Sequence, residues 1–175
     1  YFGYSVAISG DTVVVGARYG EGISGDTGSA YIYRLVKGIW EETQLFASDG
    51  ASSDFFGNSV AISEDTVVVG AYQDDDNGIN SGSAYIYRFD GSSWIETKLT
   101  ASDGAVEDSF GICVAISGDT VVVGARFDDD NGSNSGSAYI YELVKGVWQE
   151  TKLLASDGAS DDYFGKCVSI SGDGT

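Results

Sequence analysis

Two short acidic stretches carry the clearest chemical potential in this sequence. Residues 74–78 and residues 128–132 both read DDDNG, and each runs into a second shared phrase, SGSAYIY. Calcium binds six to eight oxygen atoms at about 2.3–2.6 Å, and side chains at alternate positions of a loop can converge on one point. We therefore predict calcium as the candidate cofactor, bound by two similar sets of ligands: Asp74, Asp76 and Asn77, and Asp128, Asp130 and Asn131.

The composition argues against several other kinds of site and partner. The chain has 27 Asp and Glu against 9 Lys and Arg, and a net charge of −18 repels phosphate backbones, so we expect no nucleic-acid partner. The 175 residues contain no His, which excludes imidazole-dependent catalysis and His-ligated zinc. No apolar run approaches the roughly 18 residues of a membrane span, so we expect no direct membrane insertion. The absence of Met suggests a segment of a longer chain.

An internal repeat of 54 residues organises the whole sequence. Residues 56–109 and 110–163 align without gaps and are identical at 37 of 54 positions. Such self-similarity is typical of solenoids and propellers. The repeat is marked by the phenylalanines of four Phe-Gly pairs: Phe2, Phe56, Phe110 and Phe164. It predicts blades at residues 2–55, 56–109 and 110–163 and the start of a fourth blade at residues 164–175, all within one domain.

Each unit contains four short runs that are typical of β-strands. In the first unit these are residues 2–9, 12–17, 29–34 and 39–47, separated by turn residues, and none has the apolar stripe of a helix. We therefore predict an all-β fold, a β-propeller of four-stranded antiparallel blades, with the Phe-Gly strand innermost. The outermost strand of each unit carries a tryptophan that we expect to cover the seam between blades: Trp40, Trp94 and Trp148. Because propellers need about four to eight blades, we expect further blades or other copies to close the ring, and this segment alone to self-associate or be unstable.

The first unit leaves the interpretation of the acidic stretches open. Its matching loop, residues 18–29, has Gly20, Glu21 and Gly22 where the later units have three Asp residues. The fold therefore does not require the carboxylates. A polar turn, in which Asn-Gly supplies the positive φ angle, explains the stretches as well as calcium does.

Two further sets of residues recur with the same period. Asp54, Asp108 and Asp162 lie two residues before each Phe, and we expect them to accept hydrogen bonds from backbone N–H groups at the blade junctions. Asp49, Asp103 and Asp157 each precede a Gly, which indicates a turn.

The two cysteines share one repeat position. Cys113 and Cys167 stand where Ser5 and Ser59 stand in the earlier units. Neighbouring inner strands can bring two Cα atoms within the roughly 7 Å that a disulfide needs. We favour two free thiols and leave the disulfide open.

The Phe-Gly pairs and the phrase VVVGA, at residues 13–17, 67–71 and 121–125, resemble the FG-GAP repeat family. That family forms the β-propeller of integrin α-subunits and occurs in many bacterial surface proteins, so the resemblance implies a secreted, extracellular or cell-surface location. Arg18, Tyr72 and Arg126 replace the Pro expected after Gly-Ala. The family's calcium loop lies between the first two strands, where this chain has only ISGDT or ISEDT, and we expect no calcium there.

These observations favour a non-catalytic binding or adhesion module, a fragment of a larger propeller with a protein or glycan ligand. One alternative is a structural spacer or assembly unit that calcium stabilises. A carboxylate-dependent hydrolase is the third hypothesis. Near-identical loops argue against it, because catalysis needs one asymmetric site, and only residues 18–28, with Glu21, deviate.

Overall fold

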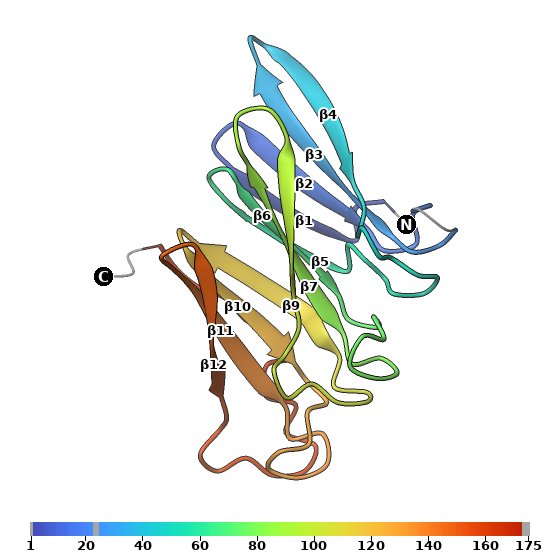
Figure 1. The fold of residues 1–175 in the computed structure, drawn as a ribbon, viewed down its shortest axis with the longest axis vertical. Coiled ribbons are helices and arrows are strands. Elements are labelled where there is room, and N and C mark those ends of the chain that lie inside the picture. Colours follow the sequence, from blue (N-terminus) through green and yellow to red (C-terminus); the bar gives the residue numbers. More distant parts are fainter. Residues whose placement is uncertain (1, 23–24, 173–175) are drawn as a thin grey trace.

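The computed structural model describes residues 2–22 and 25–172, which form three four-stranded antiparallel sheets (Figure 1). Ile23 and Ser24 of the deviant first loop, and residues 173–175 of the predicted fourth unit, lie outside the described residues. The described part of the chain holds no helix that is long and apolar enough to span a bilayer.

The strands follow one another in the same order in every unit. The first sheet contains β1 (Ser5–Ser9), β2 (Thr12–Ala17), β3 (Ser29–Val36) and β4 (Ile39–Leu45). The second contains β5 (Ser59–Ser63), β6 (Thr66–Ala71), β7 (Ser83–Phe89) and β8 (Trp94–Leu99). The third contains β9 (Phe110–Ser117), β10 (Thr120–Ala125), β11 (Ser137–Val144) and β12 (Val147–Leu153).

Each sheet is a simple meander in which consecutive strands pair. The outer hairpins of the first and third sheets turn through Lys37-Gly38 and Lys145-Gly146, whose φ angles are all positive, as a two-residue hairpin with the favoured twist requires. The meander order confirms the predicted propeller blades, with the Val-rich second strand in the interior of each sheet and the Trp strand at its outer edge.

The blades are joined through their first strands. β1 contacts β5, and β5 contacts β9, so the sheets fan outward from a common inner edge (Figure 1). Serine hydroxyl groups bridge these strands: Ser5 Oγ accepts a hydrogen bond from the Val60 N–H at 3.0 Å, and Ser59 Oγ accepts one from the Val114 N–H at 3.0 Å. The same repeat position therefore connects each pair of neighbouring blades.

The hydrophobic core consists of two clusters, each shared by two blades. Phe56 is fully buried between the first and second blades, where its ring packs edge-on against Tyr85 with centroids 5.3 Å apart. Phe110 packs in the same way against Tyr139 in the second cluster, at 5.2 Å. Trp94 and Trp148 are partly buried against these two clusters, which confirms the predicted seam position for these two residues. Trp40 of the first blade is 52% exposed.

The two glycine motifs of the repeat meet at each junction. A Cβ atom on Gly70, in the Gly-Ala pair of the second blade, would overlap the backbone carbonyl of Gly111, in the Phe-Gly pair of the third. Gly16 and Gly57 have the same relation across the first junction. Glycine is required at these positions because two backbones approach too closely for any side chain.

The first blade shows what the junction covers. Phe2 and Val6 are 62% and 66% exposed, whereas their equivalents Phe56 and Val60 are 0% and 6% exposed. In the second and third blades, the preceding blade packs on this face and removes the same side chains from water.

Replacement of Phe110 by Ala tests the role of the junction in stability. We expect the free energy of unfolding to fall by about 3–5 kcal/mol, because the change leaves a cavity between two blades. Urea unfolding measures the loss. Phe2→Ala is the matched control at the same repeat position, and its side chain is largely exposed, so we expect a loss of less than about 1 kcal/mol. Equal losses in the two variants would contradict this account of the core.

Candidate functional site

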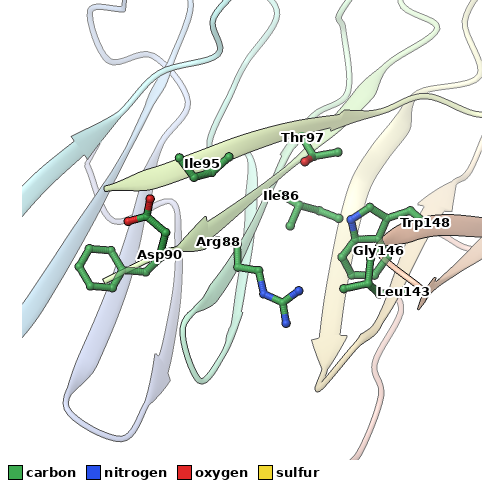
Figure 2. A pocket seen from close by; sticks show the side chains of 9 residues that line it. Ile86, Arg88, Asp90, Ile95, Thr97, Leu143, Gly146 and Trp148 are labelled. Carbon is green, nitrogen blue, oxygen red and sulfur yellow. The ribbon is translucent and has the colours of Figure 1, made fainter. Parts of the chain in front are cut away.

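The outer strands leave a groove at each blade junction. The groove between the second and third blades has a volume of about 470 Å³, and Arg88 and Thr97 of one blade face Trp148 of the next across it (Figure 2). The groove between the first and second blades has a volume of about 480 Å³ and places Arg34, Thr43 and Trp94 at the equivalent positions. One architecture therefore presents an arginine, a threonine and a tryptophan ring at both junctions.

The acidic stretches form compact turns between the second and third strands. Asp74 Oδ1 accepts a hydrogen bond from the Asp76 N–H at 3.2 Å, and Asp75 Oδ1 accepts one from the Asn80 N–H at 2.7 Å. The Asn77 side-chain amide donates to the Ala101 carbonyl at 3.2 Å. The stretch at 128–132 makes the same bonds, so both loops are held locally as polar turns.

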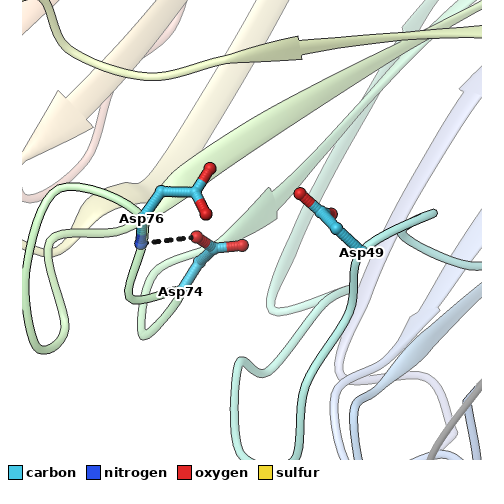
Figure 3. A group of neighbouring side chains, drawn as sticks. All are labelled: Asp49, Asp74 and Asp76. Atoms are coloured by element: carbon cyan, nitrogen blue, oxygen red, sulfur yellow. Dashed lines mark hydrogen bonds between the residues drawn. The ribbon is translucent and has the colours of Figure 1, made fainter.

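Each turn brings two carboxylates to a third from the preceding unit. Asp49, Asp74 and Asp76 lie with one carboxylate oxygen of each within 4.8 Å of the others (Figure 3). Asp74 is only 3% exposed. Three carboxylates at this spacing can hold a metal ion, and Asp103, Asp128 and Asp130 form the equivalent group at the next junction.

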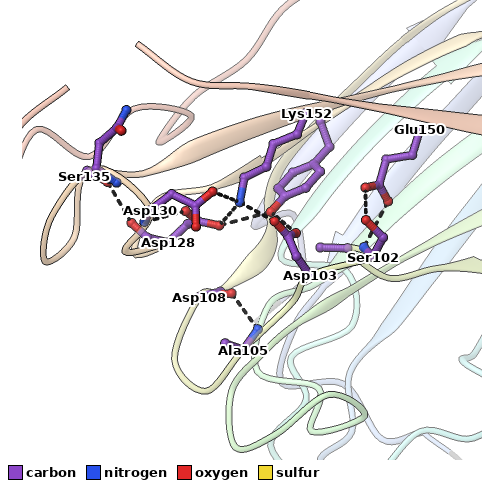
Figure 4. A network of polar contacts seen from close by, with 12 residues as sticks. Ser102, Asp103, Ala105, Asp108, Asp128, Asp130, Ser135, Glu150 and Lys152 are labelled. Atoms are coloured by element: carbon purple, nitrogen blue, oxygen red, sulfur yellow. Dashed lines mark hydrogen bonds and ion pairs between the residues drawn. The ribbon is translucent and has the colours of Figure 1, made fainter. Parts of the chain in front are cut away.

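A lysine ammonium group lies among the carboxylates of each group. Lys98 Nζ is 2.7 Å from Asp49, 3.0 Å from Asp74 and 2.6 Å from Asp76. Lys152 Nζ is 2.7 Å from each of Asp103, Asp128 and Asp130 (Figure 4). We call these two four-residue groups the junction clusters. A single positive charge compensates part of the negative charge of three side chains.

A buried tyrosine completes each cluster. The Tyr85 hydroxyl lies 2.9 Å from Asp49 and 2.8 Å from Asp74. Burial, reinforced by the charge of Asp74, raises the pKa of Tyr85 far above its usual value. The phenol therefore stays protonated and donates hydrogen bonds to these carboxylates. Burial alone would lower the pKa of Lys98, but the hydrogen bonds that its ammonium group donates to Asp49, Asp76 and Asp74 outweigh burial and raise that pKa. The lysine therefore stays charged.

The junction clusters bear directly on the predicted calcium ligands. Asp74 and Asp76 come together as predicted, and Asp128 and Asp130 do so at the second junction. The side-chain amides of Asn77 and Asn131 donate instead to the carbonyls of Ala101 and Ala155. Because the ammonium group lies at the centre of each group, a calcium ion fits only if the lysine moves away. Calcium binding at these residues remains a prediction.

Sequence reasoning missed the lysines and placed Asp49 and Asp103 only in turns. The signal was present in the comparison of units. Gln44 occupies the position of Lys98 and Lys152 in the one unit where Gly20 and Gly22 replace the aspartates. There Gln44 Nε2 donates to the Tyr31 hydroxyl at 2.8 Å. Lysine and the acidic triplet are thus present together or absent together.

A second polar contact crosses each junction beside the cluster. Glu96 accepts hydrogen bonds from the Ser48 hydroxyl at 2.5 Å and from the Tyr87 hydroxyl at 2.8 Å. Glu150 accepts the equivalent bond from the Ser102 hydroxyl at the next junction (Figure 4). The Tyr141 hydroxyl donates to the same carboxylate at 2.8 Å. Charged side chains of the outer strands therefore hold the preceding blade.

The aspartates before each Phe have the predicted structural role. Asp54 accepts a hydrogen bond from the Ala51 N–H at 2.6 Å, and Asp108 accepts one from the Ala105 N–H at 2.7 Å. Asp162 accepts one from the Ala159 N–H at 2.7 Å. Burial raises the pKa of both Asp54 and Asp108 to about 6. The predicted bonds to backbone N–H groups are confirmed.

Replacement of Lys98 by Gln, the residue of the first unit, tests the junction cluster. The variant leaves the buried Asp74 without its ammonium partner, so we expect the free energy of unfolding to fall by about 2–4 kcal/mol in chelator. If the freed carboxylates bind calcium, millimolar calcium restores part of the loss, because an ion that binds only the folded state stabilises it.

Thermal unfolding in calcium and in chelator measures both effects. The wild-type protein is the control, and we expect calcium to shift its midpoint less than that of the variant. A midpoint that calcium moves in neither protein would contradict the calcium prediction. A variant as stable as wild type in chelator would contradict the role of the lysine.

The raised pKa values of Asp54 and Asp108 predict a pH dependence of stability. Between about pH 4 and pH 6 the folded protein keeps protons that these carboxyls have lost in the unfolded chain, whose ordinary value is 3.8. Each group therefore makes the protein less stable as pH rises through this window, by about 1–3 kcal/mol.

We expect the double variant Asp54→Asn, Asp108→Asn to lose this pH dependence of stability, because an asparagine side chain does not titrate. Its amide oxygen still accepts the backbone hydrogen bond. Urea unfolding at a series of pH values measures the two slopes. Identical slopes for wild type and variant would show that these carboxyls titrate normally.

Comparison with known proteins agrees with the junction geometry. The FG-GAP repeat pattern matches residues 1–33, 40–87, 94–141 and 148–175. The second and third matches begin at Trp40 and Trp94 and end in the third strand of the next blade, so each spans one junction. No curated protein matches the chain. Because the four matches cover most of its length, the chain belongs to the FG-GAP repeat family.

Proposed function

We propose that this propeller segment is a non-catalytic binding or adhesion module of an extracellular or cell-surface protein, and that its ligand lies in the grooves between the outer strands. The observation that carries the proposal is the recurrence of one groove, with the same Arg, Thr and Trp positions, at two successive junctions. Family membership supports the general class of function.

The lining of the grooves favours a neutral glycan as the ligand. A tryptophan ring offers a flat apolar face with an N–H group at its edge, and an arginine and a threonine offer hydrogen-bond donors to hydroxyl groups. A net charge of −18 disfavours polyanionic ligands. Two equivalent grooves on one rigid frame suit a ligand with a repeating structure, because the second contact then adds avidity.

The acidic groups of the grooves give little support to catalysis. Glu41 lines one groove, but the equivalent residue in the other is Ile95. Asp90 lines the groove between the second and third blades, and its equivalent at the other groove is Val36. Hydrolysis of a glycoside needs a pair of carboxylates in fixed relation, and neither groove repeats such a pair. The carboxylates that do recur are engaged with lysine in the junction clusters, with serine and tyrosine hydroxyl groups, or with backbone N–H groups.

We also propose that a further blade of the same repeat is the partner of the exposed face of the first blade. Phe2, Val6 and Ile8 form this face, and their equivalents at the two internal junctions are covered by the preceding unit. The partner blade belongs either to the remainder of a longer chain or to another copy. If the array serves as a structural spacer, its stability would depend on the same junction contacts.

Replacement of Trp148 by Ala tests the proposed grooves. We expect binding to neutral polysaccharides on a glycan array to weaken about 10-fold or more, because an aromatic anchor is lost from one groove. Trp94→Ala should weaken binding in the same way. Trp40→Ala is the matched control, since Trp40 is 52% exposed and lines neither groove.

Calorimetry on the best array ligand gives the dissociation constants, and thermal unfolding shows that each variant is folded. If all three variants bind as tightly as wild type, the grooves are not the binding site. If the protein binds peptides instead of glycans, the proposed class of ligand is wrong.

A further inference from the structure

The two cysteines lie side by side at the junction between the third blade and the fourth unit. Cys113 Sγ and Cys167 Sγ are 3.8 Å apart, although 54 residues separate them in the chain. A disulfide bond is about 2.05 Å long, so the sulfurs need to approach by roughly 1.8 Å. Both thiols are free in the structure, Cys113 half-buried and Cys167 exposed.

The repeat places these sulfurs together by its own register. Ser5 Oγ accepts the Val60 N–H and Ser59 Oγ accepts the Val114 N–H. Cys113 Sγ takes the same role at the next junction and accepts the Val168 N–H at 3.2 Å. The cysteine pair therefore occupies a position that bridges neighbouring inner strands throughout the chain.

Other contacts fix the fourth unit against the third blade in the same register. Phe164 bridges to Gly136 as Phe110 bridges to Gly82, and Gly165 lies against Gly124 as Gly111 lies against Gly70. The proximity of the two sulfurs thus follows from backbone contacts that repeat those of the two earlier junctions, and it does not depend on a chance contact between exposed side chains.

We propose that Cys113 and Cys167 form a reversible disulfide that ties residues 164–172 of the fourth unit to the third blade under oxidising conditions. This inference does not depend on the proposed glycan grooves. It assigns to the two cysteines a covalent role at a junction where the earlier units have only a serine hydrogen bond.

The chemistry needs a small-molecule disulfide, such as glutathione disulfide, as the oxidant. The exposed Cys167 thiolate attacks that disulfide, forms a mixed disulfide and releases one small thiolate. Cys113 then attacks the Cys167 sulfur and expels the second small thiolate. Two protein thiols lose two protons and two electrons, and the oxidant is reduced to two thiols. Burial raises the pKa of Cys113, which is consistent with its role as the second, resolving thiol.

Oxidation of the purified chain in glutathione buffers tests the proposal. After free thiols are blocked with N-ethylmaleimide and the protein is unfolded, trypsin separates residues 99–126, which contain Cys113, from residues 167–175, which contain Cys167. We expect these two peptides to be recovered joined, from monomeric protein that has lost the mass of two hydrogen atoms. We also expect a thermal midpoint about 5–10 °C above that of the reduced protein, because the bond closes a long loop.

Cys113→Ser and Cys167→Ser are matched controls, since serine occupies this position in the first two units. Both should unfold at the midpoint of the reduced wild type, whether or not oxidant is present. If both peptides are recovered separately and fully labelled with maleimide after oxidation, the proposal is wrong. It is also wrong if oxidation yields only mixed disulfides with glutathione or disulfide-linked dimers. An oxidised wild type with the joined peptides but no rise in midpoint would overturn the stabilising role of the bond.

Discussion

Burial of one phenylalanine between two sheets is the contact on which the rest of the structure depends. A single four-stranded sheet cannot remove both of its faces from water, and here each blade covers the face of the next. Phe56 and Phe110 are fully buried at the two junctions, in edge-on contact with tyrosines of their own blade. The adjacent glycines let the backbones approach closely enough for this packing. Stability in such an array resides in the interfaces between repeats more than in the single repeat.

Charge at the junctions follows from the same packing. The close approach of two blades buries Asp74 and Asp128, and an isolated buried carboxylate is costly. Lys98 and Lys152 offset that cost with an ammonium group that contacts three carboxylates each. The unit with no acidic triplet has Gln44 in place of this lysine, so the cation and the anions act as one structural element. A strongly acidic chain thus uses two of its few cations to join its blades.

The polar groups that resemble a reactive site are engaged in holding blades together. What remains accessible is a recurrent groove lined by an arginine of the third strand and by a threonine and a tryptophan of the outer strands, and this is the surface on which we place the proposed ligand. At the inner edge, the serine that bridges neighbouring blades is replaced by two neighbouring thiols at the last junction. Residues at the outer and inner edges can therefore differ from unit to unit while the core residues between them stay the same.

The strands, their order within a blade, the seam positions of Trp94 and Trp148 and the bonds of Asp54 and Asp108 were all predictable from the sequence alone. These features are local or recur every 54 residues, so pattern and period suffice to predict them. The inclusion of Asp49 and Asp103 in the junction clusters follows only from the tertiary structure. Asp49 belongs to one unit and Lys98 to the next, and neither residue has a pattern that marks the other as its partner. Their contact exists because two blades pack face to face, which brings a turn of one unit against an outer strand of its neighbour. The 3.8 Å separation of the two cysteine sulfurs has the same origin, since the close backbone contacts of Gly136 with Phe164 and of Gly124 with Gly165 set the register of the fourth unit on the third blade.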